Sequence, residues 1–176
     1  HVELRIAADG EILARGPNLM QGYYGQPAAT DEAIKDGWFH TGDIGRLDDG
    51  YLTITDRKKD LLVTAGGKNV APQPIEAELK RHSLVAEAML VGDRRQFVSA
   101  VIVPDFAALA AKLKTSGETD RRTVVQRADV LVFFNGIVEE VNASRPRHEQ
   151  IRKFALLPTE FSVTTGELTP TLKVKR

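Results

Sequence analysis

The segment DRKKDLLVTAGGKNV, residues Asp56–Val70, marks the point at which the character of the sequence changes. Residues 1–56 carry 4 Lys and Arg against 10 Asp and Glu, whereas residues 57–176 carry 20 against 14. The acidic part shows the pattern of short strands and tight turns, and the basic part mixes strand and helix patterns. A basic excess suits a polyphosphate or nucleic acid, and it suits a solvated protein face equally well. We therefore expect two parts that differ in structure.

A glycine loop, Ala65–Asn69, follows a predicted short strand, Leu61–Thr64. The Gly-Gly-Lys sequence invites a phosphate-binding interpretation, but Leu62 stands where a P-loop has its first glycine, and Asn69 replaces the Ser or Thr. The loop is therefore not a Walker loop, and without further context an ordinary glycine turn is the favoured interpretation.

The acidic part predicts two β-hairpins and one short helix. The predicted strands are Val2–Ala7 with Glu11–Arg15, and Ile44–Leu47 with Tyr51–Thr55. Between the hairpins, Thr30 is placed to cap a helix over Asp31–Lys35. This stretch has too few core residues for a complete domain, so we interpret it as the remnant of a β-rich subdomain.

The basic part predicts a small mixed α/β domain, which makes the whole chain α+β. We expect strands at Val85–Val91, Val98–Val103 and Ile151–Leu157. We expect helices from Pro72 or Pro74 to about His82, from a cap at Asp105 to about Lys114, and from about Asp120 to Ala143. In the last helix the expected inward face comprises Val124, Ala128, Leu131, Asn135 and Val138.

Composition excludes several classes of protein. The 176 residues are 42% hydrophobic and contain no cysteine, which favours a globular chain without disulfides. No apolar run is long enough to span a bilayer, and nothing at the N-terminus resembles a signal peptide, so a cytoplasmic location is expected. The histidines show no metal-ligand spacing, and no protein metal site is expected.

Four segments occur in an order that resembles a known superfamily. They are GEILARGPNLMQGYY (Gly10–Tyr24), WFHTGDIGRL (Trp38–Leu47), DRKKDLLVTAGGKNVAPQPIE (Asp56–Glu76) and GELTPTLKVKR (Gly166–Arg176). The set is similar to the later motifs of adenylate-forming enzymes, the superfamily of acyl-CoA synthetases, firefly luciferase and peptide synthetase adenylation domains. Within it, GGKNVAPQPIE and the terminal TPTLKVKR most resemble bacterial long-chain acyl-CoA synthetases.

The resemblance implies a long-chain-fatty-acid–CoA ligase that uses ATP, Mg²⁺ carried by the phosphates, and CoA. A carboxylate attacks the α-phosphate of ATP to give acyl-AMP and pyrophosphate, and the CoA thiol then displaces AMP. Residues 1–58 correspond to the tail of the large adenylation domain, and residues 59–176 to the mobile C-terminal domain. Because the family's phosphate loop and acyl pocket precede this stretch, we expect the 176 residues alone to be inactive. The acyl chain length stays open.

The resemblance also implies roles for individual residues. Asp43 and Arg57 correspond to groups that bind the nucleotide ribose, and Lys59 to the hinge about which the C-terminal domain rotates. Gly66, Gly67 and Lys68 correspond to the loop that approaches CoA during thioester formation. Lys173 corresponds to the catalytic lysine, although many relatives have Gly where this chain has Leu172, and Lys175 is near enough to keep the choice open.

Alternative functions remain at this point. One is an acyl-AMP ligase or an adenylation domain that transfers its acyl group to a carrier protein. Another is a non-catalytic module that binds phosphopantetheine or nucleic acid, although no nucleic acid partner is expected. No transmembrane segment is expected, and peripheral membrane contact is left open.

Overall fold

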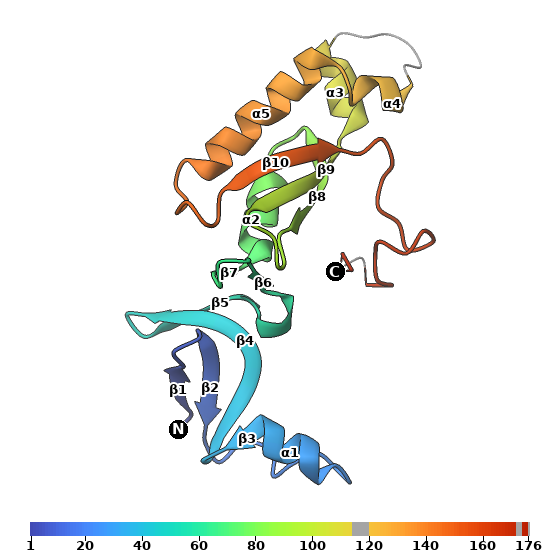
Figure 1. The fold of residues 1–176 in the computed structure, drawn as a ribbon. Helices are drawn as coiled ribbons and strands as arrows, with labels where there is room; N and C mark the ends of the chain where they lie inside the picture. Colours follow the sequence, from blue (N-terminus) through green and yellow to red (C-terminus); the bar gives the residue numbers. More distant parts are fainter. Residues whose placement is uncertain (114–119, 172–173, 176) are drawn as a thin grey trace. The chain divides into compact units, whose positions relative to one another are not determined.

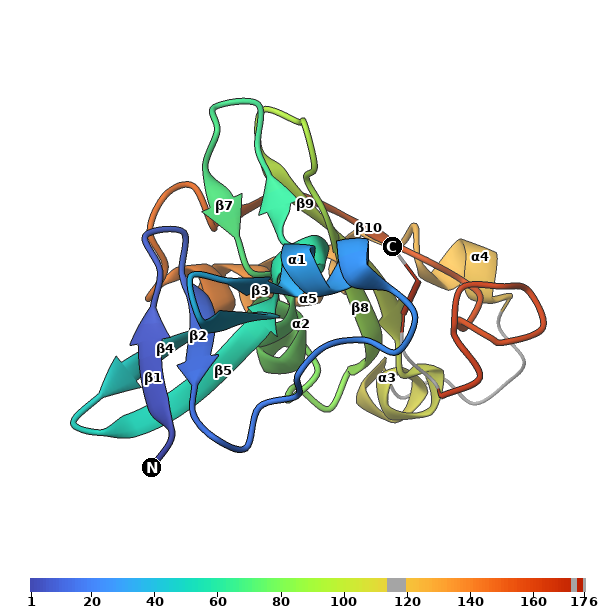
Figure 2. The same cartoon turned by 90° about the horizontal axis from the view of Figure 1, so that it is seen from below.

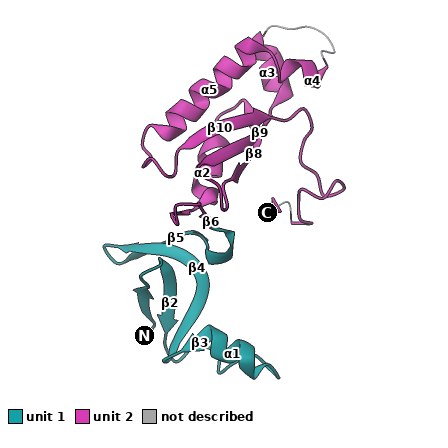
Figure 3. Ribbon diagram, in the orientation of Figure 1, with its two compact units in different colours: residues 1–61 teal, residues 62–176 magenta. Residues whose placement is uncertain are grey.

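The computed structural model describes residues 1–113, 120–171 and 174–175. Their fold is α+β, as the sequence predicts. The chain divides into two compact units, His1–Leu61 and Leu62–Arg176 (Figure 3).

The first unit is an antiparallel sheet (Figure 1). The strands are β1 (Glu3–Ile6), β2 (Glu11–Arg15), β3 (Ile34–Lys35), β4 (Trp38–Asp48) and β5 (Tyr51–Arg57). Their order is β1-β2-β4-β3, and β5 also pairs with β4. A single 3-10 turn, η1 (Lys58–Asp60), follows β5.

Both predicted hairpins are present. Asp49 and Gly50 turn between β4 and β5 with φ values of 48° and 82°, the left-handed conformations that a tight hairpin of this kind requires. Strand β4 begins at Trp38 and not at Ile44, so all of WFHTGDIGRL is strand. At Gly45, a Cβ atom would lie 2.5 Å from the Thr53 carbonyl oxygen, so only glycine fits this close strand contact.

The short helix of the first unit differs from its prediction. Helix α1 spans Pro27–Ala33, and Pro27 occupies the first turn, where a missing N–H costs no hydrogen bond. Thr30 is therefore inside the helix and does not cap it. Its hydroxyl donates to the Gln26 carbonyl oxygen at 3.0 Å and accepts from the Tyr23 amide at 2.9 Å. The proline, four residues upstream of the predicted start, decides where this helix begins.

The second unit contains a three-stranded sheet and a separate two-stranded hairpin. In the sheet, β9 (Val98–Pro104) is central, with β8 (Val85–Val91) antiparallel and β10 (Ile151–Leu156) parallel to it. The three strands lie where their apolar runs predict. The hairpin pairs β6 (Leu62–Val63) with β7 (Asn69–Val70) around the glycine loop.

Four helices among the described residues of this unit accompany the sheet. They are α2 (Pro72–Leu79), α3 (Phe106–Leu113), α4 (Arg121–Val124) and α5 (Ala128–Asn142). Helix α2 packs against β8 and α5, and the buried core joins these elements with β9 and β10. The predicted cap of α3 is confirmed, since the Ala108 amide donates to Asp105 Oδ1 at 2.9 Å.

The predicted long helix from Asp120 to Ala143 is wrong in two respects. It is broken into α4 and α5, because Arg127 has the extended ψ of 135°. Its inward face is also only partly as predicted: Val124 and Val138 are buried, but Leu131 is 39% exposed, and Ala128 and Asn135 are exposed as well. The side chains of α5 that enter the core are Val130, Phe134, Ile137, Val138 and Val141.

No helix among the described residues is both long and apolar enough to cross a membrane.

Candidate functional site

Asp43 and Arg57 lie opposite each other on neighbouring strands. They form a register pair between β4 and β5, and Arg57 Nε lies 3.7 Å from Asp43 Oδ1. Both side chains remain partly exposed, at 35% for Asp43 and 57% for Arg57. The pair therefore combines a carboxylate acceptor and a guanidinium donor, both accessible to a ligand.

A pocket of about 540 Å³ opens beside this pair. Its lining comprises residues 41–43 of β4, Arg57 at the end of β5, and Lys58 and Lys59 of η1. Lys59, the predicted hinge residue, lies in the 3-10 turn and contributes to this lining. The structure thus brings together three of the residues selected from the sequence, Asp43, Arg57 and Lys59.

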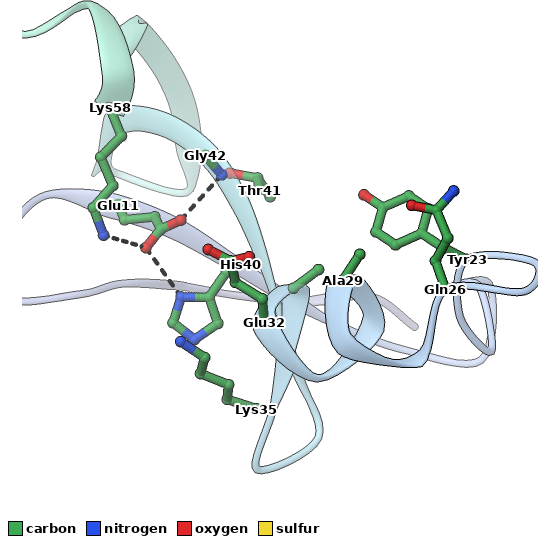
Figure 4. Close-up of a pocket in the computed structure, with 11 residues that line it drawn as sticks. Glu11, Tyr23, Gln26, Ala29, Glu32, Lys35, His40, Thr41, Gly42 and Lys58 are labelled. Atoms are coloured by element: carbon green, nitrogen blue, oxygen red, sulfur yellow. Dashed lines mark hydrogen bonds and ion pairs between the residues drawn. The ribbon is translucent and has the colours of Figure 1, made fainter.

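A buried carboxylate contacts residues that line this pocket. Glu11 is 3% exposed at the start of β2 and receives hydrogen bonds from three groups on two other segments, β4 and η1. Its Oε1 accepts from the Gly42 amide at 3.0 Å, and its Oε2 accepts from Lys58 Nζ at 2.8 Å. His40 Nδ1 lies 3.0 Å from the same Oε2. Figure 4 shows these three groups converging on Glu11.

The charges of this cluster stabilise one another. Burial acts to raise the pKa of Glu11, but the hydrogen bonds from Lys58, His40 and the Gly42 amide together outweigh it, so this pKa lies below its ordinary value. Hydrogen bonds to Asp9, at 2.7 Å, and to Glu11 raise the pKa of Lys58. The ionised forms of both groups are therefore favoured at neutral pH.

A second pocket of about 540 Å³ lies next to this cluster (Figure 4). Glu11, His40 and Lys58 line one part of it, and residues of α1 together with Tyr23 line another. Thr41, Gly42 and Lys58 border both pockets.

Sequence reasoning assigned no role to Glu11, His40 or Lys58. One signal was available for Glu11: it begins a strand whose next three residues are all apolar, so a charged side chain there must find partners on folding. Its three partners come from positions 29, 31 and 47 residues away, and no local pattern predicts such contacts.

In the second unit, the glycine loop is held by a neighbouring turn. The Ala65 amide donates to the Arg95 carbonyl oxygen at 2.8 Å, and the Arg94 amide donates to the Val63 carbonyl oxygen at 2.7 Å. Gly67 has φ +70°, as a glycine turn requires. Figure 2 shows the two loops side by side. The exposed side chains of Lys68, Arg94 and Arg95 thus belong to adjacent loops.

Lys173 lies outside the described residues, so the structure does not locate the predicted catalytic lysine. Within the described ranges, no group of three or more His, Cys, Asp or Glu side chains is arranged to hold a metal ion.

Comparison with known proteins identifies the family. The model of the AMP-binding enzyme C-terminal domain matches residues 59–176. Long-chain-fatty-acid–CoA ligase FadD15 of Mycobacterium tuberculosis is 46% identical over 177 residues, covering 98% of this chain and 30% of the relative. Human long-chain-fatty-acid–CoA ligase ACSBG1 is 38% identical, with 95% and 26% covered. The chain therefore spans less than a third of either relative.

A solved structure has a similar fold. The A domain of carboxylic acid reductase from Segniliparus rugosus, solved with AMP and a co-purified carboxylic acid, matches with a TM-score of 0.72. The match covers 100% of this chain and 29% of that one at 22% identity, so it supports the fold alone.

Proposed function

The chain belongs to the AMP-binding enzyme family, and from this we propose that it is part of an ATP-dependent long-chain-fatty-acid–CoA ligase. In this proposal, residues 1–58 complete the adenylation domain, and residues 59–176 form a C-terminal domain that rotates about Lys59 between the two half-reactions.

The observation that carries the proposal is the Asp43–Arg57 pair beside its pocket. A carboxylate can accept hydrogen bonds from both hydroxyls of a ribose, and a guanidinium can donate to its oxygens. A nucleotide held in this way has a fixed orientation, which places its α-phosphate for attack.

The chemistry proceeds in two displacements. The fatty acid carboxylate attacks the α-phosphorus of ATP, and the bond to the bridging oxygen breaks to release pyrophosphate. The CoA thiol then attacks the acyl carbon of acyl-AMP, loses its proton to solvent and expels AMP. Mg²⁺ carried on the ATP phosphates would neutralise part of their negative charge.

Replacing Asp43 with alanine in the full-length ligase is expected to lower kcat/KM for ATP about 10- to 100-fold, because the ribose hydroxyls lose a charged acceptor. Steady-state kinetics with ATP, 2′-deoxy-ATP and 3′-deoxy-ATP measure this loss. The wild-type enzyme should discriminate against the deoxynucleotides, and D43A should discriminate much less.

The matched control for D43A is Asp48→Ala. Asp48 lies on the same strand, but its exposed carboxylate pairs with Arg46, away from the pocket. The D48A variant should leave the kinetics with ATP and with both deoxynucleotides unchanged. If D43A keeps the wild-type preference for ATP over both deoxynucleotides, Asp43 does not bind the ribose.

The glycine loop is proposed to approach CoA in the second displacement. Gly66 and Gly67 leave room for the pantetheine arm, since neither has an atom within 4 Å of where a Cβ would stand. Lys68, together with Arg94 and Arg95 of the adjacent turn, offers positive charge for the phosphates of CoA. In this proposal the Asp43–Arg57 pair serves the first displacement, and the glycine loop of the C-terminal domain serves the second.

The 176-residue chain by itself is expected to form no acyl-AMP, because the phosphate loop and acyl pocket of this family lie in preceding sequence. The measurement is ATP–pyrophosphate exchange with the purified chain, a fatty acid and Mg²⁺. The full-length ligase serves as the positive control under the same conditions. Exchange above background by the chain alone would contradict this expectation.

A further inference from the structure

Strand β4 is irregular at the point where it carries Asp43. On β2, Glu11 and Leu13 are two positions apart in the sequence. Their partners on β4, Ile44 and His40, are four positions apart. Strand β4 therefore contains two extra residues here, which form a bulge. Gly42, within it, has φ +72°. Bulges re-aim side chains and leave backbone groups without their regular ladder partners.

Side chains from β2 and from the bulge itself supply the missing partners. Glu11 Oε1 accepts from the Gly42 amide. The Thr41 hydroxyl donates to the Ile12 carbonyl oxygen at 2.7 Å and accepts from the Asp43 amide at 3.1 Å. On the β2 side, the direction of Asp43 thus depends on these bonds and not on a regular ladder, whereas on the β5 side Asp43 pairs with Arg57.

The other carboxylate oxygen of Glu11 binds the segment that follows Arg57. Its Oε2 accepts from Lys58, which stands between Arg57 and Lys59 in the sequence. Asp9 holds the same ammonium group at 2.7 Å, so Lys58 is bound both to the turn between β1 and β2 and to the first residue of β2. One buried carboxylate thereby links the bulge before Asp43 to the residue after Arg57.

We propose that Glu11 is a positioning residue for nucleotide binding, which holds Asp43 and Arg57 opposite each other through the Gly42 amide and the Lys58 ammonium. This inference rests on the proposed function of that pair. The same contacts fix the chain as far as Lys58, so that rotation of the C-terminal domain begins at Lys59.

A purely stabilising role is the alternative. A buried carboxylate with three donors contributes to folding wherever it lies, and its loss would then lower stability without a specific effect on ATP. A positioning role requires in addition that the bulge loosens and that the ribose contacts weaken in a protein that is still folded.

The decisive variant is Glu11→Gln in the full-length ligase. Glutamine keeps the size of the side chain but lacks the charge, and its amide group donates where Lys58 and His40 also donate. We expect KM for ATP to rise about tenfold while kcat at saturating ATP stays within about threefold. We also expect weaker discrimination against 2′-deoxy-ATP and 3′-deoxy-ATP.

A second measurement does not depend on activity. Hydrogen exchange followed by mass spectrometry reports the amides of residues 41–43, which should exchange faster in E11Q than in wild type. Glu32→Gln is the matched control, since Glu32 is an exposed carboxylate on the wall of the pocket in Figure 4. It should change neither measurement. If E11Q fails to fold, Lys58→Met removes one contact of Glu11 and retains the aliphatic stem.

The outcomes separate the two proposals. The positioning role alone is overturned if the wild type is active but E11Q or K58M shows no change. No change means the same KM for ATP and the same exchange at residues 41–43. A fall in thermal stability with no change in KM does the same and leaves a stabilising role. Wild type that makes no acyl-CoA from ATP, fatty acid and CoA overturns the proposed function, and the exchange measurement then still decides whether Glu11 holds the bulge.

Discussion

Replacing Lys173 with alanine in the full-length ligase is expected to lower the rate of acyl-AMP formation about 100- to 1000-fold, because negative charge gathers at the α-phosphate and an ammonium group stabilises it. Formation of acyl-CoA from supplied acyl-AMP and CoA should fall far less, since that step uses the glycine loop. Pyrophosphate release and single-turnover thioester formation measure the two steps separately.

Lys175→Ala is the comparison for Lys173→Ala. Both lysines follow Thr171 in the terminal motif, and the sequence alone does not choose between them. The backbone amide of Lys175 donates to the Glu167 carbonyl oxygen at 2.8 Å. This bond does not involve the side chain of Lys175. Should K175A lose adenylation while K173A retains it, the catalytic assignment moves to Lys175. Equal losses in both half-reactions with K173A would contradict a role limited to adenylation.

Replacing Phe134 with alanine is expected to destabilise the second unit by about 3 to 5 kcal/mol, because it removes a large buried ring and leaves a cavity. Phe134 is 0% exposed in the core between α5, α2 and the sheet. Urea unfolding of the 176-residue chain, followed by circular dichroism, measures the change in the free energy of unfolding. The variant keeps the proposed nucleotide and CoA residues intact.

Phe133→Ala provides a control on the same helix. Phe133 is 36% exposed and contacts the Lys112 ammonium, 4.8 Å from the ring centroid, so its loss should cost about 1 kcal/mol or less. The pair also tests the orientation of α5. A larger cost for F133A than for F134A would mean that the helix is rotated relative to the structure.

The orientation of α5 shows why periodicity was insufficient. The helix has apolar side chains at five consecutive positions, 130–134, so more than one face fits a spacing of three and four residues. The sequence-based face included Leu131 and Asn135, and the structure buries Val130 and Phe134 in their place. Contact with α2 and the sheet decides between these faces, and such contacts have no local signature.

The strands were predicted more closely. Val85–Val91 and Val98–Pro104 agree with their apolar runs to within one residue, because β9 is buried along most of its length and β8 buries Val85, Ala88 and Leu90. The bulge in β4 escaped prediction, since two extra residues on one strand are visible only after β2 supplies the register. The break between α4 and α5 was not predicted for a related reason. Arginine is compatible with a helix, so the residue type at position 127 gives no sign of the break.

The sequence by itself determined the strands of the core, the hairpin turns and, through its ordered motifs, the family. Those properties depend on residue type and on near neighbours. Only the tertiary structure decided that Glu11 receives hydrogen bonds from Gly42 and Lys58, and that Asp43 faces Arg57 across two strands. Contacts between residues 14 to 47 positions apart depend on sheet register, which long-range packing selects and no short segment encodes.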